Sequence, residues 1–339
     1  MVKITIYDVA EEAGVSIATV SKVINNTGRI GKVTREKVLQ AMEKLNYQPS
    51  FVASALTGKK TETIGLLVPD ISNPFFSEIA RTIEDRAHER GKSVIMCSTN
   101  YNEKKEKKYI ELLQRKQVDG IIVTSGFQNR TLVQQMQQNG TPLALLAQDD
   151  PILNVSVVSV DDFKGGYMAA SFLFENGHTN IGIIGEKVQS SKMRVYGCLE
   201  ALEMEGIQVE KKNVINTTAS IENGRKGILQ LLDCDNPPTA VFAVNDLIAI
   251  GAIKGAREVG VLVPEDLSII GFDNTILATT TVPELTTIAQ PMRDMGNKIV
   301  DILIEEIETE NSTKNKERIL FVPELIVRGT TANLLVNKI

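Results

Sequence analysis

Apolar residues recur at helical spacing through the amino-terminal segment and predict three short helices. Each of the first two helices has one apolar face, formed by Ile6, Val9, Ala10 and Ala13 in the first and by Val20, Val23 and Ile24 in the second. Gly14 between them readily adopts a left-handed turn, Ser16 can cap the second helix, and Thr5 with Asp8 forms a capping-box-like pair at the first. The pattern predicts a helix-turn-helix, followed by a third helix over about 32–44.

The second predicted helix turns a small, polar and basic face outward, formed by Ala18, Ser21, Lys22 and Asn25. A helix that enters the DNA major groove, which is about 12 Å wide, needs small side chains and hydrogen-bond donors on that face. The alternative is an ordinary pair of surface helices in another kind of domain. Because the cap, the turn and both faces agree, we expect a DNA-binding head.

Charge is distributed unevenly along the chain. Residues 1–60 contain nine Lys and Arg against five Asp and Glu, a net charge of +4, whereas the whole chain carries −5. The remainder is therefore acidic, and affinity for a polyanion is expected at the amino-terminal end only.

The segment 49–60 predicts a linker with barely two turns of helix between a cap at Ser50 and a stop at Gly58. A helix this short is marginal in water, so its folding requires a partner. The same segment of a second copy can supply that partner through Val52 and Ala55, together with a DNA minor groove. A plain interdomain tether is the alternative, although tethers are usually more polar.

After residue 61, short β-branched runs alternate with amphipathic helices, a pattern typical of parallel sheets covered on both faces. The segment is too long for a single hydrophobic core, so we expect two α/β lobes. One consists of residues 61–161 plus about 290–322, and the other of residues 162–289 plus about 323–339. The predicted strands are Thr63–Val68, Lys92–Cys97, Gly120–Thr124, Pro142–Ala147, Asn180–Gly185, Ala240–Val244 and Leu267–Phe272.

Polar residues directly follow most of these runs, and ligands of open α/β sheets bind beyond the carboxyl ends of the strands. Carboxylates and amides pair with hydroxyl groups while aromatic rings cover apolar faces, so we expect a small polyhydroxylated ligand.

Other roles stay open for these residues. Asn245 and Asp273 could cap helices, Phe75 or Phe76 could be core, and Arg194 could form a surface ion pair. Tyr101 and the charged run at 104–108 are interpreted as a solvated helical face without chemistry.

The sequence offers no support for catalysis, a cofactor or a metal site, because it lacks the usual phosphate-loop, nucleophile-elbow and metal-binding motifs. His88 and His178 fall near helix ends, and Cys97, Cys198 and Cys234 are widely separated, as expected of reduced thiols. There is neither an apolar run long enough for a membrane span nor a signal-peptide pattern at the amino terminus. We therefore expect a cytoplasmic protein that is not an enzyme and has no membrane partner.

The segments TIYDVAEEAGVS and ATVSKVIN, followed by TREKV and LNYQP, closely resemble the lactose-repressor (LacI/GalR) family of bacterial transcription regulators. The resemblance extends over essentially the whole chain. It implies a helix-turn-helix head (1–48), a hinge helix (49–60) and a two-lobed core like periplasmic sugar-binding proteins (61–339). Two positions depart from the family pattern, since Lys22 replaces the usual Arg and Gly31 replaces the usual Ser cap of the third helix.

The resemblance also implies which residues contact ligands. The residues that it implies contact the bases are Ile17, Ala18 and Lys22. It implies that Leu56 is the wedge inserted into the minor groove. We expect DNA contacts from Thr5, Tyr7, Ser16, Ile17, Ala18, Thr19, Ser21, Lys22, Asn25, Arg29, Thr34, Tyr47, Val52, Ala53 and Leu56. We expect effector contacts from Asn73, Phe75, Phe76, Phe127, Asp149, Arg194, Asn245, Asp273 and Gln290.

These features predict a repressor that binds a pseudo-palindromic DNA operator as a homodimer and responds to a sugar or a similar small metabolite. Leucine heptads that could assemble larger oligomers are absent after Arg328. Control of the core by a partner protein, such as a phosphorylated carrier, is the alternative. A transport binding protein and an enzyme with a DNA tether are less consistent with the sequence.

Overall fold

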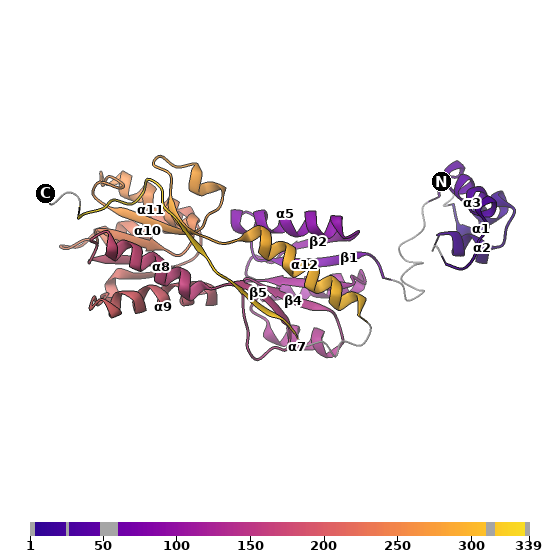
Figure 1. The fold of residues 1–339 in the computed structure, drawn as a ribbon, viewed down its shortest axis with the longest axis horizontal. Helices are drawn as coiled ribbons and strands as arrows, with labels where there is room; N and C mark the ends of the chain where they lie inside the picture. Colours follow the sequence, from indigo (N-terminus) through magenta and orange to yellow (C-terminus); the bar gives the residue numbers. More distant parts are fainter. Residues whose placement is uncertain (1–3, 25–26, 48–59, 310–315, 336–339) are drawn as a thin grey trace. The chain divides into compact units, whose positions relative to one another are not determined.

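The computed structural model describes residues 4–24, 27–47, 60–309 and 316–335 (Figure 1). The chain forms two compact units, Met1–Thr61 and Glu62–Ile339, which we call the head and the core and describe separately. Residues 48–59 lie outside the described part, so the hinge helix and the domain boundaries 1–48, 49–60 and 61–339 stay predictions.

The head contains the predicted helix-turn-helix, formed by α1 (Ile6–Ala13) and α2 (Ile17–Ile24). Gly14 between them has a φ of 65°, the left-handed conformation that glycine adopts without strain. At the start of α1, the Asp8 carboxylate accepts hydrogen bonds from the backbone N–H and the hydroxyl of Thr5, both at 2.7 Å. The Ser16 hydroxyl accepts the Thr19 N–H at 3.2 Å and so caps α2.

Helix α3 (Lys32–Lys44) closes a miniature core against the other two helices. Val9, Val20 and Val38 are fully buried in it, and Met42 and Leu45 pack partly buried against them. Gly31 precedes α3 with an extended backbone and offers no side chain to cap it. The predicted helix over 32–44 is therefore confirmed.

The core is built on two six-stranded sheets. The first has the strand order β11-β5-β4-β3-β1-β2 and is parallel throughout. Its strands are β1 (Thr63–Val68), β2 (Ser93–Ser98), β3 (Gly120–Thr124), β4 (Leu143–Leu146), β5 (Ser156–Val160) and β11 (Arg318–Phe321).

The second sheet has the order β12-β10-β9-β8-β6-β7, and only the β10–β12 pair is antiparallel. Its strands are β6 (Ile181–Glu186), β7 (Val214–Thr217), β8 (Ala240–Ala243), β9 (Ser268–Asp273), β10 (Thr286–Ala289) and β12 (Glu324–Ile326).

Helices cover both faces of each sheet, which explains the continuous apolar runs of the inner strands. In the first lobe, Ile64 and Leu66 of β1 belong to the same cluster as α5 (Pro74–Glu89) and α12 (Met292–Glu308), whereas Leu67 belongs to that of α6 (Glu103–Arg115) and α7 (Arg130–Gln138). Figure 1 shows α5 and α12 on one side of this sheet and α7 on the other. The helices of the second lobe are α8 (Asp162–Glu175), α9 (Gln189–Met204), α10 (Ile221–Leu232) and α11 (Asp246–Glu258).

The chain changes sheet three times. It crosses between β5 and α8, between β10 and α12, and between β11 and β12. The last return appears in Figure 1 as the yellow strand that leaves the first lobe and runs along the second. All three crossings involve strands at or next to the β11 and β12 edges, whereas residues at the ends of β1, β2, β6 and β7 line a cleft between the lobes, which we call the outer cleft.

The fold class predicted from the sequence is confirmed, and the strand predictions need correction in detail. The runs 63–68 and 120–124 match β1 and β3, whereas those at 92, 142, 180 and 267 each begin one residue early, and the runs 142–147 and 240–244 end one residue late. The prediction missed β5, β7, β10, β11 and β12. Strands β7 and β11 are half-exposed sheet edges, and β5 and β10 contain buried Ser and Thr that interrupt the apolar run. Within the described ranges, every helix falls short of the length and apolar character that a bilayer span requires.

Candidate functional site

The outer face of α2 carries most of the predicted base-reading residues. Ile17 is 39% exposed, Ala18 and Lys22 are exposed, and Thr19 and Ser21 are half-buried. Among the residues that the structure describes, Lys22 forms no ion pair, so its ammonium is available to a ligand. Small side chains beside one basic group give α2 the shape and the donors that entry into a major groove requires.

The other predicted DNA contacts are scattered over the head. Thr5, Tyr7, Ser16 and Arg29 are exposed. Thr34 and Tyr47 are half-buried, and Tyr47 packs against the core of the head. The predictions for Asn25, Val52, Ala53 and Leu56 lie outside the described residues.

A polar pocket with a cavity volume of about 40 Å³ lies between the two lobes, where the carboxyl ends of strands from both sheets meet. The first lobe lines it after β1, β2, β3 and β4, and the second lobe after β6, β8 and β9. The lining residues are Asn73, Phe75, Phe76, Tyr101, Ser125, Gly126, Ala147, Glu186, Val188, Ser190, Arg194, Asn245 and Asp273.

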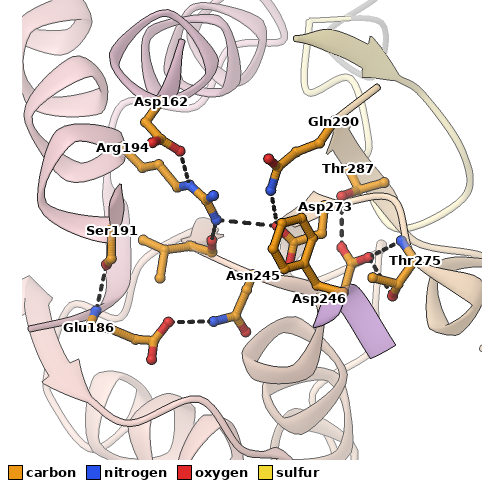
Figure 2. Close-up of polar contacts among 12 residues, drawn as sticks. Asp162, Glu186, Ser191, Arg194, Asn245, Asp246, Asp273, Thr275, Thr287 and Gln290 are labelled. Atoms are coloured by element: carbon orange, nitrogen blue, oxygen red, sulfur yellow. Dashed lines mark hydrogen bonds and ion pairs between the residues drawn. The ribbon is translucent and has the colours of Figure 1, made fainter. Parts of the chain in front are cut away.

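Arg194 on α9 is the buried cation of this pocket. Its Nε donates to Asp162 at 2.7 Å, and its Nη1 donates to the Val244 carbonyl at 2.7 Å and to Asp273 at 3.3 Å (Figure 2). The guanidinium also stacks 3.6 Å from the ring centroid of Phe272. These contacts rule out the surface ion pair and hold the guanidinium in one orientation.

Asp273 ends β9 in a conformation that few side chains adopt, with a φ of 116°. Its Oδ1 accepts both Arg194 and, at 2.7 Å, the amide of Gln290, so it does not cap a helix. Gln290 therefore does not line the pocket, and it acts on the pocket only through its hydrogen bond to Asp273. The surrounding hydrogen bonds maintain this strained backbone and fix the carboxylate at the pocket wall.

Asn245 combines the two roles that the sequence left open. Its Oδ1 accepts the Ile248 N–H at 2.9 Å and caps α11, while its Nδ2 donates to Glu186 at 2.7 Å. Glu186 was not predicted, although it directly follows the apolar run of β6. Its other oxygen accepts the Ala219 N–H at 2.9 Å, so the carboxylate is held at the pocket by two neutral donors.

Asn73, Phe75 and Phe76 line the pocket from the start of α5. The Asn73 side chain accepts the Phe75 N–H at 3.1 Å, and Pro74 fills the first helical position. The two rings form an edge-to-face pair with centroids 5.1 Å apart and belong to the hydrophobic core. Both interpretations of the phenylalanines therefore hold, since they are core residues with one side toward the pocket.

Tyr101 was interpreted from the sequence as part of a solvated helical face, and this was wrong. It lies in the turn after β2 with a φ of 53° and lines the pocket. Its ring covers Gly126, where an added Cβ would lie 2.6 Å from Tyr101 Cε1. Burial, with a smaller effect of nearby Glu186, raises the pKa of Tyr101, so its hydroxyl stays protonated and can donate.

The structure does not bring Phe127 and Asp149 into this pocket. Phe127 packs against the cluster under α6 and α7. Asp149 forms an ion pair with Arg318 and lines a separate cavity on the side of the crossovers. Both lie three residues beyond a strand, and the loops after β3 and β4 turn their side chains elsewhere.

Burial dominates the electrostatics of the pocket. It raises the pKa of Asp162, Glu186 and Asp273, and the guanidinium of Arg194 offsets only part of that effect. Behind them, Asp246 accepts hydrogen bonds from the Thr275 N–H and from the hydroxyls of Thr275 and Thr287 (Figure 2). Burial raises the pKa of Asp246 to about 6 despite these donors. The pocket is therefore acidic and largely buried, which strengthens the hydrogen bonds made in it.

We expect Asp246→Asn to change how the stability of the core depends on pH. A carboxyl whose pKa rises from 3.8 to about 6 on folding favours the native state at low pH, and that contribution is lost as pH rises toward 6. Relative to the wild type, the variant should therefore gain about 1 kcal/mol in free energy of unfolding between pH 5 and 7.5. Urea unfolding at both pH values measures this.

Glu222→Gln is the matched control for that measurement. Arg225 holds the pKa of exposed Glu222 at about 2, so this carboxylate is ionised across the whole range. The difference between Glu222→Gln and the wild type should be the same at pH 5 and 7.5. Equal pH dependence of the Asp246→Asn variant and the wild type would contradict the prediction.

Two family models match the chain. The one described as bacterial regulatory proteins, lacI family, matches residues 5–50, and a periplasmic binding protein-like domain matches residues 170–331. The HTH-type transcriptional regulator DegA of Bacillus subtilis (strain 168) is 46% identical over 98% of this chain and 99% of its own length. Catabolite control protein A of Priestia megaterium is 38% identical over 91% of this chain and 93% of its own length.

Solved structures show the same architecture. The lac repressor dimer bound to operator and the anti-inducer ONPF superposes with a TM-score of 0.87, at 29% identity, over 98% of this chain and all of that chain. A LacI family transcriptional regulator from Enterococcus faecium with bound ribose gives a TM-score of 0.72 at 34% identity, over 80% of this chain and 99% of that one. The first of these similarities covers both the head and the core.

Proposed function

The chain belongs to the LacI family of bacterial regulatory proteins, and from this membership we propose that it is a transcriptional repressor that binds a pseudo-palindromic operator as a homodimer. We propose further that a sugar or a similar small polar metabolite, bound between the lobes, controls its affinity for DNA. It acts in the cytoplasm and is not an enzyme.

One observation carries the proposal for DNA: the exposed face of α2, where Ala18 and Lys22 stand beside Ile17 on a capped helix. The solved lac repressor dimer, which superposes on this chain, is bound to its operator. A single small head makes few base contacts, so two heads on a two-fold axis are needed for useful affinity. Half-sites about one helical turn apart follow from that symmetry.

The pocket supports the proposal for a small effector. Hydroxyl groups of a ligand can pair with the fixed side chains of Arg194, Asp273 and Asn73, while Phe75 and Phe76 cover an apolar face. The Enterococcus faecium regulator, which is similar in fold, was solved with bound ribose. Control by a partner protein is less favoured, because it gives this buried polar pocket no role.

We place the coupling between ligand and DNA in the cleft. A ligand that closes it changes the angle between the lobes and so changes how closely two linkers of a dimer approach each other. A coupling free energy of about 1–3 kcal/mol, equivalent to a 5- to 150-fold change in DNA affinity, suffices for regulation.

The proposal is tested by selecting duplexes from random oligonucleotides with the purified chain at moderate salt, followed by gel shift with and without metabolites. We expect a palindromic site whose affinity responds to a metabolite that is not consumed. A chain that is monomeric and indifferent to every duplex would refute the proposal.

Lys22→Ala should reduce affinity for the selected site by about tenfold or more, because one side chain that reaches a base edge contributes about 1–3 kcal/mol to discrimination. Fluorescence anisotropy on the selected and on a scrambled duplex measures both affinities. Lys44→Ala is the control, since Lys44 pairs with Glu12 at 2.6 Å on the surface of the head. If the affinity of both variants falls by the same small factor on the selected and the scrambled duplex, Lys22 does not read a base.

A further inference from the structure

The pocket between the lobes contains more negative charge than its single cation can balance. Arg194 shares the pocket lining with two carboxylates, those of Glu186 and Asp273, and a third, that of Asp162, pairs with Arg194 from outside the lining. Arg194 already pairs with Asp162 and Asp273. Among the described residues, Glu186 forms no ion pair and is held only by the neutral donors of Asn245 and Ala219. Its charge is the one left without a counterion.

The pocket lining offers both donors, such as the Tyr101 hydroxyl and Nη2 of Arg194, and acceptors, among which the carboxylates of Glu186 and Asp273 carry negative charge. Asp273 uses Oδ1 for both of its hydrogen bonds, to Arg194 and Gln290. Gln290 is only 5% exposed, and its Oε1 has no hydrogen-bond partner. Figure 2 shows this oxygen turned away from Asp273, because the amide N–H₂ of Gln290 faces the carboxylate. A ligand that pairs with the carboxylates of Glu186 and Asp273 must bring hydrogen-bond donors.

From this arrangement we propose that the effector is an amino-bearing polyol, such as an amino sugar, whose ammonium group binds Glu186. The inference rests on the proposed function, because it names the ligand class of the same pocket. An ammonium supplies three donors and the missing positive charge, and hydroxyls of the same ligand reach Asp273 and Arg194.

The position of Glu186 suits this role. It ends β6 at the boundary between the pocket and the outer cleft, which it also lines. The Ser191 hydroxyl accepts the Glu186 N–H at 2.7 Å and anchors its backbone. Burial raises the pKa of the Glu186 carboxyl, which shows that its charge is poorly solvated and that an adjacent cation would stabilise it.

The same charges exclude anionic ligands from the inner pocket. A phosphate or carboxylate there would meet the negative charges of Glu186 and Asp273, and Arg194 is already paired with Asp162 and Asp273. Lys187 is exposed and lines only the outer cleft, where solvent and salt screen it. We therefore expect sugar phosphates to be rejected.

Calorimetry on the full-length protein tests the inference with matched probes. Glucose, galactose and mannose are each titrated as the neutral sugar, the 2-amino sugar and the 6-phosphate. We compare the three forms of the hexose that binds most tightly. Its amino sugar should bind at least about tenfold more tightly than its neutral form, and its phosphate should not bind. A neutral sugar or a phosphate that binds as tightly as the amino sugar overturns the inference and leaves the proposed function standing.

Glu186→Gln tests the assigned residue. It keeps the shape of the side chain and removes the charge, so the preference for the amino sugar should fall to less than about threefold. Glu222→Gln, on the surface of α10, should keep the full preference. A preference retained in Glu186→Gln overturns the assignment. If none of the nine compounds binds the wild type, the ligand class and the effector half of the proposed function both fail, whereas operator selection still tests the DNA half.

Discussion

Arg194→Ala is expected to reduce the free energy of unfolding of the core by about 3–5 kcal/mol and to abolish effector binding. The side chain is buried between Asp162 and Asp273, and its removal leaves two buried carboxylates without a counterion. Burial already raises the pKa of both carboxyls, so proton uptake relieves part of the cost. The loss should therefore be larger at pH 8 than at pH 5.5, as measured by urea unfolding.

Arg225→Ala is the matched control for that measurement. Arg225 also bridges two carboxylates, those of Glu222 and Glu258, at 2.8 and 2.9 Å, but it does so on the protein surface. Exposed ion pairs contribute little to stability because solvent and salt screen them, so this variant should unfold close to the wild type. If the two variants lose similar stability, or if Arg194→Ala still binds the effector, the central role of Arg194 is wrong.

The parts of the fold that the sequence predicted are those in which local pattern and tertiary burial agree. Strand β1 is buried on both faces along its whole length, so its apolar run in the sequence begins and ends where the strand does. Strand β7 is half-exposed at a sheet edge, and only its pairing with β6 distinguishes it from a loop. In the head, Gly14 and Ser16 define the turn and the cap locally, so the helix-turn-helix was predicted from the sequence alone.

The site was predicted where a residue lies at the end of a strand or matches a family motif. Asn245 and Asp273 lie at the ends of β8 and β9, Arg194 on α9 was predicted from its family motif, and the structure brings the three together. Tyr101 could not be predicted in the same way, because its place depends on a left-handed backbone and on its contact with Gly126 in another loop. The position of Glu186 at the end of the apolar run of β6 could have marked it as a site residue. The sequence does not show, however, that the amide of Asn245 donates a hydrogen bond to Glu186.

The contact between α8 and α9 brings backbone against backbone at two glycines. A Cβ added at Gly166 would lie 1.8 Å from the carbonyl oxygen of Arg194, and one added at Gly197 would lie 1.9 Å from that of Phe163. The helices can approach this closely only because neither residue has a side chain. The close approach also fixes the position of Arg194 in the pocket wall.

Gly166→Ala is therefore expected to cost at least about 3 kcal/mol in free energy of unfolding, since the methyl group meets rigid backbone and the two helices must separate. The shift displaces Arg194 from Asp162 and Asp273, so effector affinity should fall as well. Urea unfolding of the full chain and calorimetry with the effector measure the two losses.

Gly227→Ala separates this effect from that of any added methyl group in a helix. A Cβ at Gly227 on α10 meets the side chain of Ile184 at 3.1 Å, which can move, and alanine favours the helix over glycine by about 1 kcal/mol. This variant should therefore stay within about 1 kcal/mol of the wild type. If Gly166→Ala unfolds at the same urea concentration as Gly227→Ala, the α8 and α9 contact does not determine the position of Arg194, and the pocket must be held by its own hydrogen bonds alone.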